Sequence, residues 1–290
     1  MKIAAAIVVL CLGASGALAQ IQLELKVPRL QYIAYEPVTV HLALTNLAGR
    51  DVEFRDENGQ AWLGFEITGG QGESIGPISV SKELPLKVEA GKTVVRKINL
   101  APLYSIQDFG TYHVRAHIYF ADLNRFFYSQ TRVFEVTDAR PIWQKTVGIP
   151  KENKISGDTR TYSLMTNRFP DHTSLYVRVE DKDSGVVYAT YSLGRIIASD
   201  PPQAQFDLAN QLHVLYYAAP RSWGYARIGL DGELVSHGAF LETKTRPRLV
   251  RGDDGSVKVS GGIAVAAAQA VSPRGAQRTS PQSSNVPQGN

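Results

Sequence analysis

Residues 108–120 read DFGTYHVRAHIYF, and this stretch decides the fold. From residue 112 onward, apolar side chains occupy every second position: Tyr112, Val114, Ala116, Ile118 and Phe120. Polar or amphipathic side chains fill the positions between them: His113, Arg115, His117 and Tyr119. Successive side chains of a β-strand point to opposite faces, so this alternation predicts a strand with one face in a core and one in water.

The same alternation recurs elsewhere in the N-terminal half. Residues 38–45 alternate clearly, and residues 94–100 alternate more weakly. Asn58-Gly59 lies between the apolar segments 52–54 and 62–67, which predicts a β-hairpin. Amphipathic helical spacing is missing from the segment expected to fold, and the predicted fold class is therefore all-β.

Asp108, Gly110 and Tyr112 fit the pattern D-x-G-x-Y-x-C, with Val114 in the cysteine position. This motif resembles the tyrosine corner of immunoglobulin-like β-sandwiches. The resemblance implies that the Tyr112 hydroxyl bonds to upstream backbone and fixes the corner. It gives Asp108, Gly110 and Tyr112 structural roles.

Two further segments, Tyr35–Val38 and Ala90–Lys92, resemble the strand openings of bacterial immunoglobulin-like and macroglobulin-like modules. The resemblance covers residues 20–137 and implies an antiparallel sandwich there. Both bridging cysteines of antibody domains are missing from it. Because such sandwiches carry unrelated activities, the resemblance concerns the fold and not the function.

Residues 138–150 (DARPIWQKTVGIP) contain proline near both ends and are interpreted as a linker. A second antiparallel β domain is expected over residues 151–262, and its sequence repeats at an offset of 37. The repeated residues are Leu175, Val177, Tyr188, Ala189 and Leu193, which recur as Leu212, Val214, Tyr225, Ala226 and Leu230.

Repeats of about 40 residues resemble propeller blades, but a ring typically needs four or more blades. The second domain is therefore either a small sandwich or open sheet built from two blade-like hairpin repeats, or a partial propeller completed by a partner. The first is favoured, because an isolated set of blades leaves unpaired strand edges.

The two ends of the chain differ from the part between them. Residues 1–19 combine Lys2, an apolar run and Ala17-Leu18-Ala19, which predicts a cleaved signal peptide and a periplasmic or extracellular location. The apolar run is too short to span a bilayer and no longer run follows, so we expect no membrane span. Residues 263–290 include a long Ser-, Pro- and Gln-rich stretch and are predicted to form a disordered tail.

Composition excludes several chemistries for the exported chain. The only cysteine, Cys11, lies in the signal peptide, so disulfides, a thiolate nucleophile and cysteine metal ligands are excluded after cleavage. The net charge is +4 over 290 residues, with no basic cluster. This charge argues against a nucleic-acid partner.

Several short motifs are better explained by structure than by chemistry. Residues 72–76 match G-x-S-x-G, but an extended segment follows where the hydrolase elbow needs a helix. Residues 91–93 lack the first glycine of a phosphate loop. His113 and His117 lie too far apart on a strand to share a metal. Residues 181–185 and 251–253 are typical of charged turns. We therefore predict no catalytic residue, metal ligand or cofactor.

Aromatic side chains of the second domain are the remaining candidates for a ligand surface: Trp143, Tyr216, Tyr217, Trp223 and Tyr225. They suit either a flat stacking surface for a sugar or an anchor for a protein partner. The alternative is that they fill the second core.

These features favour a non-catalytic exported protein that acts in recognition or envelope structure, with a protein or glycan partner. A hydrolase acting on an envelope polymer stays open, because catalytic groups meet in space and not in sequence order. A secreted protease inhibitor using the loop at residues 69–77 is a third hypothesis.

Overall fold

The structure is a computed structural model that describes residues 21–79, 83–149 and 159–265. It confirms the all-β prediction: the described residues form sheets that are antiparallel except for one strand pair, and their single helix is the short 3-10 segment η1 (Ala121–Leu123). Helices long and apolar enough to cross a membrane are missing from these ranges. The predicted signal peptide and residues 266–290 of the predicted tail lie outside them.

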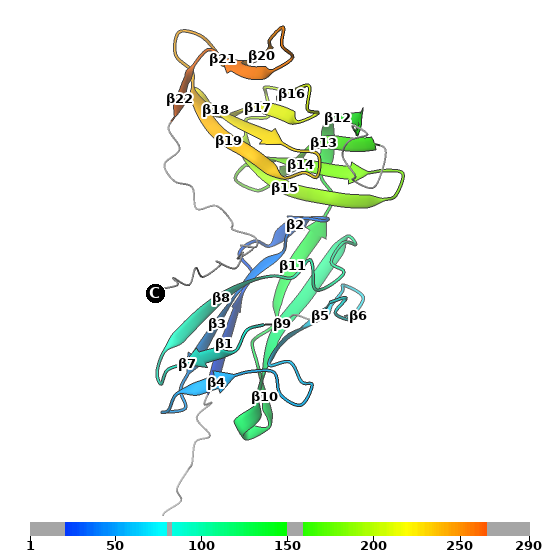
Figure 1. The fold of residues 1–290 in the computed structure, drawn as a ribbon. Coiled ribbons are helices and arrows are strands. Elements are labelled where there is room, and N and C mark those ends of the chain that lie inside the picture. Colours follow the sequence, from blue (N-terminus) through cyan, green and yellow to red (C-terminus); the bar gives the residue numbers. More distant parts are fainter. Residues whose placement is uncertain (1–20, 80–82, 150–158, 266–290) are drawn as a thin grey trace, which may run out of the picture. The chain divides into compact units, whose positions relative to one another are not determined.

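Most of the N-terminal strands form two sheets that face each other across one core (Figure 1). The first sheet has the order β1-β3-β8, comprising β1 (Ile21–Lys26), β3 (Thr39–Asn46) and β8 (Thr93–Asn99). The second has the order β2-β11-β9-β5-β6, comprising β2 (Gln31–Ile33), β11 (Arg132–Thr137), β9 (Gly110–Phe120), β5 (Leu63–Thr68) and β6 (Ser74–Ile75), with β10 (Arg125–Tyr128) paired to β9. The pairing of β2 with β11 is parallel.

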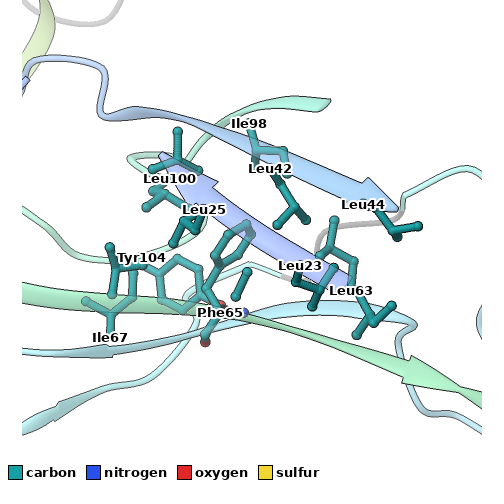
Figure 2. Close-up of a cluster of buried hydrophobic side chains, with 14 of the residues drawn as sticks. Leu23, Leu25, Leu42, Leu44, Leu63, Phe65, Ile67, Ile98, Leu100 and Tyr104 are labelled. Carbon is teal, nitrogen blue, oxygen red and sulfur yellow. Dashed lines mark hydrogen bonds between the residues drawn. The ribbon is translucent and has the colours of Figure 1, made fainter. Parts of the chain in front are cut away.

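Alternating apolar residues from both sheets fill this core. Figure 2 shows Leu23 and Leu42 of the first sheet beside Leu63 and Phe65 of the second. Strand β9 contributes its inward side chains as the alternation predicts, with Val114 at 0% exposure. Burying a leucine or phenylalanine this completely contributes about 1.5–3 kcal/mol, so this core supplies much of the folding energy.

The predicted hairpin at Asn58-Gly59 is wrong beyond its turn. Both residues have positive φ, and the turn closes a single bridge between Glu57 and Gln60. Strand β4 (Val52–Phe54) then pairs with β7 (Leu86–Val88), while β5 pairs with β9. The Trp62 side chain that follows this turn is 1% exposed and packs against Phe54 of β4 in the core, with ring centroids 5.7 Å apart.

Residues 140–148, expected to be a linker, form strand β12 (Arg140–Gly148) instead. It pairs along its length with β13 (Thr159–Arg168), in the sheet β12-β13-β14-β15 completed by β14 (Thr173–Asp181) and β15 (Val186–Ile196). Its side chains are mostly exposed, so its sequence lacks the apolar alternation of a half-buried strand. Pro141 adjoins a break in the register, where a missing N–H is tolerated.

A further sheet has the order β16-β17-β18-β19-β22, and a separate hairpin is formed by β20 and β21. The strands are β16 (Gln203–Phe206), β17 (Leu212–Ala219), β18 (Ser222–Ile228), β19 (Leu234–Leu241), β20 (Arg248–Arg251), β21 (Val257–Ser260) and β22 (Ile263–Val265). Strand β22 contains the first residues of the predicted tail and pairs with β19. The sequence repeat maps hairpin β14–β15 onto hairpin β17–β18, which hold different positions in their sheets.

The chain divides into two compact units. The first falls within Met1–Arg195 together with Leu230–Glu233, and the second within Ile196–Gly229 together with Leu234–Asn290. Each unit is treated separately below.

Candidate functional site

An exposed group of aromatic rings lies on the outer face of the sheet formed by β5, β9 and β10, in the first unit. It consists of His117 and Tyr119 on β9 and Phe126 and Tyr128 on β10, and we call it the aromatic platform. In the antiparallel register Tyr119 lies opposite Phe126, and His117 lies opposite Tyr128. Since the other face of β9 fills the core, these four rings point away from it.

The rings contact one another in a continuous group. The centroid of Phe126 lies 5.1 Å from that of Tyr119, 5.7 Å from that of His117 and 6.3 Å from that of Tyr128. Cross-strand aromatic pairs of this kind stabilise a sheet, which is the purely structural explanation for them. Phe126 and Tyr128 are nevertheless 36% and 47% exposed, so the rings leave apolar surface uncovered.

His117 forms the base of the platform. Its ring lies against Gly64 on β5, so closely that a Cβ added there would be 2.5 Å from Nε2. Its Nδ1 atom is buried and has no hydrogen-bond partner. Burial lowers the pKa of His117 below its ordinary value of 6.5, against an opposing effect of Glu66, and Arg115 lowers it further. The imidazole is therefore neutral at pH 7.

Polar contacts fix the edges of the platform. The Arg115 guanidinium lies 4.6 Å from the centroid of the Tyr128 ring and forms an ion pair with Glu66 at 2.6 Å. The Tyr119 hydroxyl donates to Oδ1 of Asn124 at 2.8 Å, and Asn124 adopts the left-handed conformation that ends η1. The platform is thus pre-organised, with one cation beside exposed aromatic rings, and it can bind by apolar contact, stacking and hydrogen bonding.

The sequence-predicted structural residues lie next to the start of β9. The Tyr112 hydroxyl donates to the backbone carbonyl of Asp108 at 2.7 Å, which is the geometry of a tyrosine corner. Gly110 has φ +146°, a conformation that side chains rarely adopt. The Tyr112 ring stacks on Phe134 with centroids 5.4 Å apart.

The predicted aromatic ligand surface is not a single exposed face. Trp223 and Tyr216 are 1% and 7% exposed, because Trp223 packs in a core with Leu215 and Leu249, and the Tyr216 ring covers Gly224. Tyr217 and Tyr225 are half-buried against the same core. Trp143 is half-buried on β12, in the other unit.

The short motifs occupy turns and strands. Ser74 of the G-x-S-x-G match lies in the two-residue strand β6. Asp181 accepts hydrogen bonds from the backbone N–H groups of Asp183 and Ser184, so it closes the β14–β15 turn. Residues 251–253 begin the turn between β20 and β21. Groups of three or more metal-ligating side chains are missing from the described ranges.

The first unit also contains a pocket of about 530 Å³, lined by residues of β2, β11, β14 and β15 and of the turn between β13 and β14. Within its lining, Asp171 accepts a hydrogen bond from the His172 ring at 2.7 Å, which lowers the pKa of Asp171, and Arg195 pairs with the second oxygen at 3.1 Å. The Tyr176 hydroxyl accepts from Arg29 at 3.3 Å, and burial raises the pKa of Tyr176 to about 12.

Comparisons with known proteins identify no relative. No family model matches the chain, and no curated protein is similar to it in sequence. Among solved structures, the sporulation control protein Spo0M from Bacillus subtilis aligns with a TM-score of 0.29 and 8% identity, covering 60% of this chain and 91% of that one. A likeness this weak carries no argument about the protein.

Sequence reasoning placed His117 and Tyr119 on the outer face of the strand but did not single out Phe126 and Tyr128. The available signal was the pair of aromatic residues two positions apart, directly after a turn containing Asn124. With an antiparallel return strand, those rings had to lie opposite the outward residues of β9.

Proposed function

We propose that this protein is an exported, non-catalytic recognition protein that binds a protein partner through the aromatic platform. The observation that carries the proposal is the exposure of Phe126 and Tyr128 in a group of contacting rings. Tyrosine and arginine are enriched among the residues that dominate protein–protein binding energies, and the platform contains Tyr119 and Tyr128, with Arg115 at its edge. An immunoglobulin-like sandwich, as the Tyr112 corner suggests, is a common scaffold for such surfaces.

The ring geometry favours a protein over a glycan partner. Phe126 is tilted by 46° from Tyr119 and by 35° from Tyr128, so the rings do not share one plane. An uneven apolar surface suits interdigitating side chains, whereas a flat sugar face stacks best on a flat surface.

The test compares the mature protein with the double variant Phe126→Ala/Tyr128→Ala. Phe109→Ala is the matched control, because Phe109 is a 66% exposed aromatic residue outside the platform. Each variant is used to capture proteins from envelope and medium fractions of the source, and the affinity for the captured partner is then measured. We expect the double variant to bind at least about tenfold more weakly, and the control to bind normally.

Two outcomes would contradict the proposal. One is equal binding of one partner by the double variant and the wild type. The other is platform-dependent binding to purified cell-wall polysaccharide with no protein partner, which would assign the platform to a glycan. Export is tested separately, by fractionating cells and sequencing the N-terminus of the mature chain, with residue 20 expected first.

One observation favours a second candidate function, hydrolysis. The pair Asp171–His172 lies in the 530 Å³ pocket together with Ser174 and Ser192, and a carboxylate-oriented imidazole is the usual general base of a serine hydrolase. Turnover of a chromogenic ester or of envelope polymer, abolished by His172→Gln, would support this function. Equal turnover by wild type and His172→Gln would exclude this site.

A further inference from the structure

The second unit contains a groove that the proposed function does not use. Its volume is about 710 Å³, and its lining includes Asp200, Gln203, Trp223, Arg246, Pro247 and Arg248. All of these residues belong to the same unit. We call this site the Arg246 groove.

Arg246 is held in one orientation by an aromatic support. Its guanidinium lies 4.5 Å from the centroid of the Trp223 ring and 6.0 Å from that of Tyr217. The indole itself is fixed, because Trp223 is 1% exposed and its Nε1 donates to Glu242 at 3.1 Å. A guanidinium stacked on a buried indole is ready to form hydrogen bonds with little loss of conformational freedom.

The hydrogen-bonding capacity of Arg246 is only partly used. Nη2 pairs with Asp200, and no other acceptor among the described residues lies within hydrogen-bond distance of this guanidinium. The side chain is still 52% exposed, so the remaining N–H groups have access to the groove. A guanidinium offers five N–H donors in a planar fork that matches carboxylate or phosphate oxygens.

The charges of the lining favour an anion. Arg246 and Arg248 contribute two positive charges, against one negative charge from Asp200. Arg248 is exposed and pairs with no carboxylate of the described residues. Pro247 is buried beside these groups, and together with Trp223 it gives the groove an apolar wall.

From this arrangement we infer that the Arg246 groove binds a small ligand bearing a carboxylate or phosphate group, which Arg246 holds bidentately with help from Arg248. The structural role of Trp223 and Tyr217 is then to support Arg246. This inference concerns the second unit and is independent of the platform in the first.

The test measures binding of two simple probes, inorganic phosphate and citrate, to the mature protein by titration calorimetry at constant ionic strength. Saturable binding of either probe is expected, and the tighter one identifies the preferred anion. Arg246→Gln should weaken binding at least about tenfold, and Arg246→Lys should also weaken it, because lysine lacks the planar fork. Arg251→Gln is the matched control, since it removes an equal charge from an exposed position outside the groove lining.

The variant Asp200→Asn distinguishes an anion-binding role of Arg246 from a purely structural ion pair. If Asp200 competes with the ligand for Arg246, this variant should bind the probe several-fold more tightly. A merely structural ion pair predicts a lower thermal midpoint with no gain in affinity, and that result would overturn the inference. Equal weakening by Arg246→Gln and Arg251→Gln, or binding that never saturates, would also overturn it. If Arg246→Gln fails to fold, Arg248→Gln provides the same comparison and is expected to weaken binding.

Discussion

A single hydroxyl joins the loop before β9 to the strand itself. Tyr112→Phe keeps the ring that stacks on Phe134 and removes only the hydrogen bond to the Asp108 carbonyl. We expect a loss of about 1 kcal/mol in the free energy of unfolding, measured with urea. Tyr128→Phe is the control and should be nearly neutral, because its side chain is exposed. A loss above about 3 kcal/mol would mean that the ring itself had moved.

His117 makes the stability of the first unit depend on acid pH. Its pKa is lowered in the folded protein, so the unfolded chain binds a proton more readily. The contribution of the neutral His117 side chain to the free energy of unfolding is therefore complete above the unfolded pKa of 6.5. It is lost as the pH falls through the lower pKa of the folded protein. The charged groups facing the ring are Glu66 on β5 and Arg115 on β9, and the Tyr119 and Tyr128 rings lie on the same face of the sheet.

This dependence can be measured as the thermal midpoint of the wild type and of His117→Gln between about pH 7 and pH 5. The midpoint of the wild type should fall more steeply with acid than that of the variant. His41→Gln serves as the control and should keep the wild-type slope. Parallel curves for wild type and His117→Gln would contradict the prediction.

The strand β3 is tied to the small sheet β4-β7 by one buried amide. The Asn46 side chain is 0% exposed, donates to the carbonyls of Arg50 at 2.8 Å and Val88 at 2.9 Å, and accepts from the N–H of Ala48 at 2.9 Å. Asn46→Ala leaves these groups without their partner, and we expect it to cost about 3 kcal/mol in the free energy of unfolding. Thr45→Ala, the neighbouring partly exposed position, should cost less than about 1 kcal/mol. Similar costs for both would show that the amide does not hold the two elements together.

Individual strands were predictable where one face of the strand is buried and the other is exposed to solvent. The period-two patterns at residues 38–45 and 112–120 gave β3 and β9, because such alternation leaves little choice of register. Strand β12 was missed because its side chains are exposed on both faces. The pairing of β4 with β7 was missed because the turn at Asn58-Gly59 predicts a local hairpin. Strand β7 is distant in the sequence, and the pairing with it is favoured only once both strands pack on the shared core.

Buried tyrosines make both units sensitive to alkali. Burial raises the pKa of Tyr176 in the first unit and of Tyr216 in the second to about 12, from an ordinary value of 10.0. The unfolded chain releases these protons first, so stability falls as the pH rises above 10 toward 12. The thermal midpoint should drop over this range in step with phenolate absorbance. Tyr176→Phe should reduce the fall in thermal midpoint of the first unit, and Tyr216→Phe that of the second. An unchanged fall in both variants would contradict the claim that these two tyrosines cause it.

The sequence by itself determined the all-β class and the inward face of β9, because strand alternation is a local property of neighbouring residues. Only the tertiary structure decided which aromatic residues are exposed. Trp223 and Tyr216 are aromatic residues on strands, as Phe126 and Tyr128 are, yet the first two are buried and the last two are not. The exposure of a side chain depends on which other residues pack over its face of the sheet. In the first unit the described residues leave Phe126 36% exposed and Tyr128 47% exposed. That difference places the candidate recognition surface on the sandwich and leaves Trp223 as the support of Arg246.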